Sequence, residues 1–99
     1  MSEIAVTDVP DRSRYEARVA GEVAGFVDYQ RGADGLVLVH TEVDDAYEGQ
    51  GVGSDLVRGV LDNIAARGET VAKVTCPFIT TWLRRHPDYA ERVGTGTPG

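Results

Sequence analysis

The chain has a single cysteine, Cys76, among its 99 residues, which excludes an internal disulfide framework. Its apolar runs fall well short of the ~20 residues of a membrane-spanning helix, and its N-terminus carries no signal-peptide pattern. Basic residues are scarce, with 10 lysines and arginines against 16 aspartates and glutamates, and none cluster beyond Arg84-Arg85. These absences predict a protein of the reducing cytoplasm that contacts neither nucleic acid nor membrane.

What remains is the composition of an ordinary globular domain, with 41% hydrophobic and 26% charged residues. The length predicts one domain over residues 1–93. Residues 94–99 contain only glycine, threonine and proline, and we expect them to form a disordered tail. Because the net charge is −6, any anionic ligand has to be held by local backbone donors rather than by the overall field.

Hydrophobic periodicity predicts strands before helices along the chain. Alternating residues indicate strands at 4–9, 14–20 and 23–30, and Gly21-Glu22 is typical of a tight hairpin. Residues 36–43 begin with a run that is apolar on both faces, as in a central strand, and residues 70–76 predict another buried strand. The order predicts a two-layer α+β fold in which antiparallel strands lead into a β-α-β crossover and a short C-terminal helix.

The crossover itself is predicted to be a helix. Apolar residues recur at helical spacing from Val52 to Ile64, and Arg67-Gly68 closes the pattern. Gly59 inside this helix costs about 1 kcal/mol relative to alanine, for which close packing on the sheet is one explanation. The last helix is expected from Pro77 to about Arg85, with His86-Pro87 ending it.

The segment that joins the central strand to the helix carries glycines at three alternate positions, Gly49, Gly51 and Gly53. Such a loop leaves backbone N–H groups open at a helix N-terminus, which suits a phosphate or pyrophosphate. A P-loop is excluded because the loop contains no lysine, and a dinucleotide fingerprint fails because Ser54 stands where its third glycine belongs. The alternative is a strand-to-helix turn without a ligand, for which one glycine would suffice.

The loop matches the last two positions of the acetyl-CoA loop Arg/Gln-x-x-Gly-x-Gly/Ala of the GNAT acetyltransferases. With its flanking motifs, the chain from Tyr15 to Tyr89 resembles the small one-domain branch of GNAT-like N-acetyltransferases. The residues that carry the resemblance are His40-Thr41-Glu42-Val43, Glu48-Gly49-Gln50-Gly51-Val52-Gly53, Cys76-Pro77-Phe78, Trp82-Leu83 and His86-Pro87-Asp88-Tyr89. One departure is Glu48, a carboxylate at the usual basic or amide position, which repels a pyrophosphate unless it turns outward.

The resemblance implies an acetyl-CoA-dependent N-acetyltransferase that uses acetyl-CoA and no metal, and acts on an amine carried by a small molecule or a protein. It also implies that the pantetheine arm lies where strands 36–43 and 70–76 splay apart. The expected CoA-binding residues are Val43, Glu48, Gly49, Gln50, Gly51, Val52, Gly53, Ser54, Phe78 and Trp82. The chain lacks the helices that wall the acceptor site in larger relatives, so an alternative is a CoA- or acyl-CoA-binding module with little turnover.

Acetyl transfer to an amine needs a base and a proton donor for the leaving thiolate. His40 and Glu42 lie two apart on one strand and so share a face, and either could be the base, directly or through a water. The alternatives are a hydrogen-bonded core histidine and a solvated strand end. His40 and His86 have no partner at metal-ligand spacing, so no metal site is expected.

Cys76 ends the partner strand and precedes the helix that begins at Pro77, where a thiolate is favoured. It could accept the acetyl group covalently or protonate the leaving thiolate, and the alternative is a small buried hydrophobe. Phe78 and Trp82 share one face of the same helix. They could line the pantetheine or adenine, or pack in the core.

Overall fold

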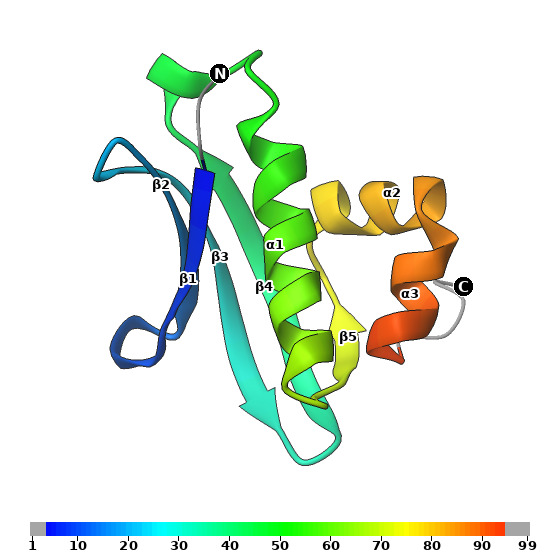
Figure 1. Ribbon diagram of the computed structural model, residues 1–99. Helices are drawn as coiled ribbons and strands as arrows, with labels where there is room; N and C mark the ends of the chain where they lie inside the picture. The colour runs from blue at the N-terminus through cyan, green and yellow to red at the C-terminus, as the bar shows by residue number, and fades with distance from the viewer. Residues whose placement is uncertain (1–3, 95–99) are drawn as a thin grey trace.

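The structure is a computed structural model that describes residues 4–94. A five-stranded sheet in the order β1-β2-β3-β4-β5 is crossed on one face by helix α1 (Figure 1). The strands are β1 (Ile4–Val9), β2 (Arg14–Val19), β3 (Glu22–Gly32), β4 (Gly35–Val43) and β5 (Val71–Val74), and the helices are α1 (Val52–Ala66), α2 (Pro77–Arg85) and α3 (Pro87–Val93). None of these helices is long and apolar enough to cross a membrane.

The sheet confirms the predicted α+β fold. Strands β1 to β4 pair in antiparallel fashion, and α1 carries the chain over to β5, which pairs with β4 in parallel. Strand β5 is shorter than the predicted 70–76, because it pairs with β4 only beside Leu36, Val37 and Leu38. Beyond the hydrogen bond from the Thr75 N–H to the Leu38 carbonyl (3.0 Å), β4 and the segment that follows β5 separate. Within residues 4–94, β4 therefore has no strand partner on this side after Leu38.

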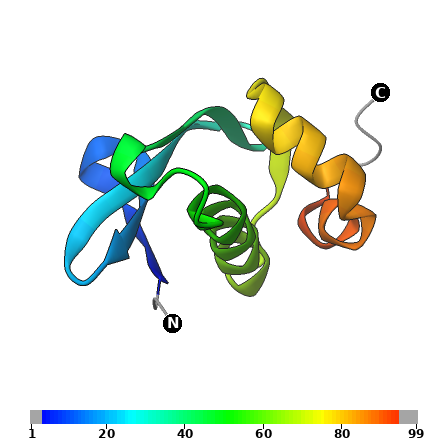
Figure 2. The ribbon, with the colours of Figure 1, turned by 90° about the horizontal axis from the view of Figure 1, so that it is seen from above.

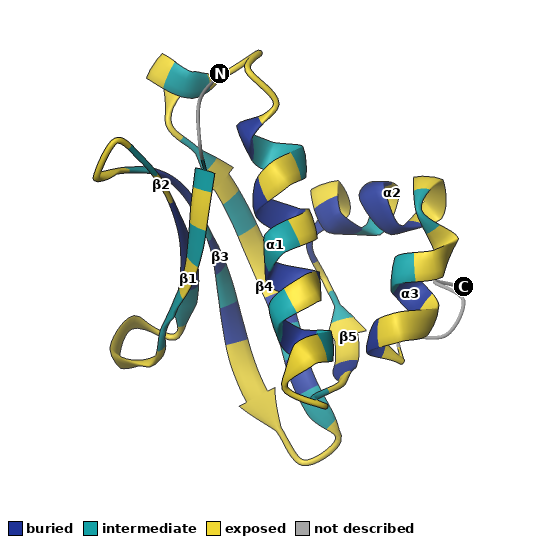
Figure 3. Cartoon of the chain, in the orientation of Figure 1, coloured by how far each residue is buried: buried dark blue, intermediate teal, exposed yellow. Residues whose placement is uncertain are grey.

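The core lies between α1 and the sheet, where Tyr15 and Val27 from the strands meet Leu56 and Ile64 from the helix. Figure 3 shows the buried segments where β2, β3 and α1 face one another, and an exposed hairpin between β3 and β4. The close packing suggested for Gly59 is present, because a Cβ there would lie 2.6 Å from Cγ2 of Val6.

Helix α3 was not predicted from the sequence. His86-Pro87 does end α2, but Pro87 also occupies the first turn of a new helix, where proline is favoured and Asp88 adds an acid. Ala90 and Val93 are buried, and Figure 2 shows α2 and α3 grouped on the β5 side of the molecule. Gly94 closes α3 in the left-handed region (φ 75°) rather than beginning a tail. The rest of the predicted tail, residues 95–99, lies outside the described residues.

Candidate active site

The glycine loop begins beyond the end of β4 and is shaped by backbone rather than by side chains. Asp44 accepts a hydrogen bond from the Ala46 N–H (2.9 Å) and starts a single 3₁₀ turn, Asp45–Tyr47. Gly49 and Gly51 then adopt φ values of 79° and 78°, which favour glycine. Gly51 caps α1 without any side-chain hydrogen bond. The first-turn N–H groups of the helix are thus left to solvent or to a ligand.

A cleft of about 390 Å³ opens above this loop. We call it the loop cleft, and it is lined by Thr41, Val43, Tyr47, Glu48, Gly49, Gly51, Val52, Gly53, Ser54 and Phe78. Most of the residues expected to bind CoA therefore lie together around one hollow. Gln50 does not line it, and its side chain donates to the Ala46 carbonyl (3.1 Å). Thr41 and Tyr47 were missed, although Thr41 could have been found from its position two residues before Val43 on the same strand.

A second hollow of about 490 Å³ continues from the loop cleft past the start of α2, and the two share Ser54 and Phe78. Phe78 is 47% exposed, so core packing does not account for it. Trp82 lines this second hollow but not the loop cleft, and it is 5% exposed. Its Nε1 donates to Ser54 Oγ (2.8 Å), and its ring stacks on His86 with the centroids 3.9 Å apart. Trp82 therefore packs in the core and also forms part of the wall of the second hollow. Arg85 lines the same hollow.

Cys76 lies at the point where β4 and β5 separate, as the resemblance implied. It is 3% exposed and is not among the residues that line the loop cleft. Its Sγ donates to Thr41 Oγ1 (3.4 Å), and Thr41 does line the cleft. Because the Thr41 oxygen accepts from the thiol, its own O–H is directed elsewhere. Thr41 therefore stands between the cysteine and any ligand in the cleft.

A β-bulge decides which way the side chains of β4 point. Asp28 pairs with His40 but Tyr29 pairs with Leu38, so Val39 is an extra residue in β4. Without the bulge, His40 would share the buried face of Leu38. With it, His40 and Glu42 lie on the opposite face, 57% and 62% exposed, with Nε2 and Oε2 3.7 Å apart. His40 is therefore not a core residue, whereas Glu42 matches the expected exposed strand end.

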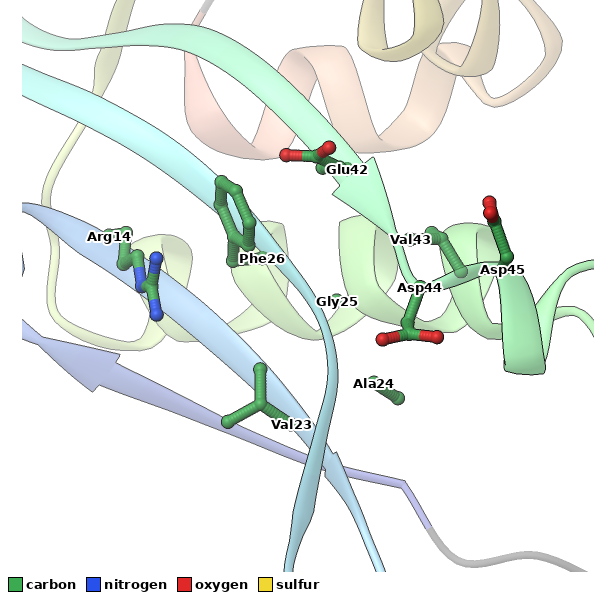
Figure 4. A pocket seen from close by; sticks show the side chains of 9 residues that line it. All are labelled: Arg14, Val23, Ala24, Gly25, Phe26, Glu42, Val43, Asp44 and Asp45. Atoms are coloured by element: carbon green, nitrogen blue, oxygen red, sulfur yellow. The ribbon is translucent and has the colours of Figure 1, made fainter.

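On that opposite face, β2, β3 and the end of β4 enclose a hollow of about 430 Å³ (Figure 4). We call it the open-face pocket, and it is lined by Arg14, Val23, Ala24, Gly25, Phe26, Glu42, Val43, Asp44 and Asp45. Val43 also lines the loop cleft, so it lies between the two hollows at the end of β4. His40 lies nearby, with its ring centroid 6.3 Å from that of Phe26.

The positive charge of Arg14, which lines the open-face pocket, is balanced by Glu16. The Arg14 guanidinium lies 4.5 Å over the Phe26 ring and donates twice to Glu16 Oε2, at 2.7 and 2.9 Å. Glu16 is 3% exposed and is also bound by Arg18 (3.0 Å). These hydrogen bonds, that from Arg14 first, lower the pKa of the Glu16 carboxyl. Within residues 4–94 no group of three or more metal-ligating side chains gathers at a site for a metal ion.

Comparison with known proteins identifies the family of this chain. The family described as GCN5-related N-acetyl-transferase matches residues 14–93, which contain four of the five strands and all three α-helices. Protein NATD1 of Bos taurus is 38% identical over 58 residues, covering 57% of this chain and 50% of that protein. NATD1 of Mus musculus and of Homo sapiens are each 36% identical over 58 residues, covering 57% of this chain and 52% and 50% of those proteins. The chain thus spans about half the length of these curated relatives. With its mixed five-stranded sheet and its α1 crossover, the chain has a GNAT-like fold and belongs to the GCN5-related N-acetyltransferase family.

Proposed function

We propose that the protein is a cytoplasmic acetyl-CoA-dependent N-acetyltransferase that acts on an amine. The observation that carries the proposal is the position of the loop cleft. The cleft extends from the N-terminus of α1, where no side chain caps the helix, to the stretch of β4 that has no strand partner. Helix N–H groups suit a pyrophosphate, and the free edge of β4 suits the amides of a pantetheine arm. Phe78, at the wall between the two hollows, would cover the arm.

The amine would approach from the other face of β4. Glu42 or His40 takes a proton from the ammonium, directly or through a water, and the freed lone pair attacks the thioester carbonyl carbon. The C–S bond breaks, the acetyl group stays on the nitrogen, which releases its second proton, and the CoA thiolate takes up a proton. Thr41 is the side chain best placed to supply that proton, because it lines the loop cleft and its oxygen accepts from the Cys76 thiol. The Cys76 thiol would then replace the proton on Thr41, and the proton released by the nitrogen would restore the thiol.

Direct transfer is the route we favour over an acyl-cysteine. Cys76 is buried behind Thr41, so a thioester in the loop cleft would meet the hydroxyl before the sulfur. Mass spectrometry after exposure to acetyl-CoA separates the two routes. We expect no acetyl adduct on Cys76, whereas an adduct that disappears in Cys76→Ser would establish the covalent route.

Titration with acetyl-CoA is the direct test of the function. Ligand at 100 times its Kd adds about 2.7 kcal/mol of stability, which for a domain of this size raises Tm by roughly 10 °C or more. Gly53→Leu would place a side chain toward Phe78 and Val43, because even a Cβ at this position lies 3.0 Å from Cζ of Phe78. We expect it to abolish the shift.

The matched control is Ala66→Leu, which adds the same side chain at the exposed last turn of the same helix. It should bind acetyl-CoA as the parent does. Absence of binding at millimolar acetyl-CoA in the parent protein contradicts the proposal.

A second candidate is a CoA- or acyl-CoA-binding module with little turnover. Glu48 favours it, because this carboxylate lines the cleft that would hold a pyrophosphate. The two functions differ in one measurement, the release of free CoA when amines are added to the acetyl-CoA complex. Tight binding without release across a broad panel of amines would favour the binding module.

A further inference from the structure

We propose that the acceptor is a small aliphatic diamine or polyamine, with its reacting amine beside Glu42 and a second ammonium group bound by Asp44 in the open-face pocket. This inference rests on the proposed acetyl transfer and names the substrate class of that site. It is carried by the shape of the pocket, its charge and its position against the loop cleft.

The pocket is built by an irregularity in β3. Ala17 pairs with Gly25 but Arg18 pairs with Val23, so Ala24 is an extra residue that bends the strand. Gly25 follows without a side chain, because a Cβ there would lie 2.7 Å from the Glu42 carbonyl oxygen. The bulge and the glycine leave a hollow with Phe26 on one side and Asp44 on the other (Figure 4). Its volume of about 430 Å³ lies in the range of small-molecule sites.

The charges in this hollow favour a cation. Figure 4 shows the Asp44 carboxylate directed toward Ala24, and the Asp45 carboxylate turned away. Among residues 4–94 no lysine or arginine forms an ion pair with Glu42 or Asp44, and six of the arginines bind other carboxylates. Arg14, the cation on the wall, is held by Glu16. The face of Phe26 adds an aromatic surface next to the carboxylates, which also attracts an ammonium group.

The Cα separation of the two acidic residues sets the minimum length of the acceptor, because Figure 4 shows their carboxylates pointing apart. Glu42 and Asp44 are two residues apart on extended chain, and a strand rises ~3.3 Å per residue, so their Cα atoms are separated by about 6 to 7 Å. An extended diamine with four or five methylenes spans about the same distance, at the ~1.2 Å per bond of an extended chain. Val43 lies between the two carboxylates and forms part of the loop cleft. An amine beside Glu42 would therefore lie close to the thioester while the second amine remains in the pocket.

The experiment compares amines of matched length as acceptors, with acetyl-CoA at saturation. We expect kcat/KM for 1,4-diaminobutane and 1,5-diaminopentane to exceed that for n-butylamine and n-pentylamine by 10-fold or more. Asp44→Asn should remove this preference by raising KM for the diamines, with the monoamines changed less than twofold. The amide oxygen of asparagine can still accept from the Ala46 N–H, so the turn is retained.

The matched control is Asp34→Asn, which makes the same change of charge in the hairpin between β3 and β4, outside the open-face pocket. It should keep the diamine preference. Equal use of monoamines and diamines by the parent, or equal effects of the two substitutions, would overturn the inference while leaving acetyl transfer in place. Preference for a lysine-containing peptide over every diamine would also overturn it.

A binding measurement separates this inference from the proposed function. In NMR titration of the protein with 1,4-diaminobutane, we expect amide shifts at Gly25, Phe26 and Val43 that are lost in Asp44→Asn. If these shifts occur but no amine is acetylated, the pocket assignment stands and the acetyltransferase proposal fails. If the shifts are absent or persist in Asp44→Asn, the pocket assignment fails whatever the activity.

Discussion

Gly59→Ala is expected to destabilise the protein, although alanine is the better helix former. At an unconstrained helix position the change would stabilise the fold by about 1 kcal/mol. Here the new Cβ would lie 2.6 Å from Cγ2 and 2.8 Å from Cβ of Val6, closer than unstrained carbon atoms approach. Overpacking of this kind costs about 1 to 3 kcal/mol. The net result is a loss of about 0 to 2 kcal/mol in the free energy of unfolding.

The size of this loss should depend on the side chain at position 6. Val6→Ala removes both methyl groups, Cγ2 at 2.6 Å and Cγ1 at 3.3 Å, but leaves the Cβ contact at 2.8 Å, so Gly59→Ala should become close to neutral in that background. Val6→Gly removes all of these contacts, and Gly59→Ala should then stabilise by about 1 kcal/mol. The change of sign across the series measures the packing of α1 on β1, independently of the cost of each Val6 substitution.

Urea unfolding of the parent, the three single variants and the two double variants provides the free energies. The m-values should stay constant, because none of the changes alters how much surface the fold buries. If Gly59→Ala stabilises the parent by about 1 kcal/mol, or has the same effect in all three backgrounds, α1 does not contact β1 as the structure describes.

Three further predictions concern the site and its surroundings. Glu48→Gln should tighten acetyl-CoA binding several-fold at low salt, and the gain in affinity should shrink at high salt as charges are screened. If calorimetry gives equal affinities for the two proteins at low salt, the carboxylate faces away from the pyrophosphate. Thr41→Val should lower kcat roughly 10- to 100-fold with little change in KM for acetyl-CoA, and Thr41→Ser should keep kcat near the parent value. Equal losses of kcat in both variants in steady-state kinetics would remove the hydroxyl from the mechanism. The pKa of Glu16 is lowered by hydrogen bonds from Arg14, so its contribution to stability is present above its ordinary value of 4.5 and is lost as pH falls through the lower folded value. Urea unfolding at stepwise lower pH should therefore show a smaller loss of stability in Glu16→Gln than in the parent, and parallel curves would contradict this assignment.

The main elements follow from the sequence because local patterns agree with tertiary packing. The apolar stripe from Val52 to Ile64 is the buried face of α1, and the alternation in 14–20 is the inward and outward pleat of β2. Helix α3 was missed because Pro87 was interpreted only as the end of α2. Proline and Asp88 also favour a helix start, and with two short helices the sequence pattern does not decide whether they are joined or separate.

The arrangement of the site depends on two irregularities that leave little trace in sequence. Simple alternation would place His40 and Glu42 on the buried face of Leu36 and Leu38, and the extra Val39 reverses this. The extra Ala24 in β3 similarly produces the open-face pocket. Each bulge needs the partner strand to be one residue out of step, which is a property of the pairing and not of either segment alone. For this reason the glycine loop could be found from sequence, and the pocket opposite it could not.

The carboxylates near the site differ in which hollow they line. A net charge of −6 disfavours an anionic ligand only if the carboxylates surround it. Glu42 and Asp44 line the open-face pocket, whereas the loop cleft offers the N–H groups at the start of α1. Glu48 is the one carboxylate that lines the loop cleft. Glu48 can turn into solvent, and Asp55 in the first turn of α1 adds a second negative charge near the pyrophosphate site, whereas Glu42 and Asp44 favour a cationic acceptor on the other face of β4.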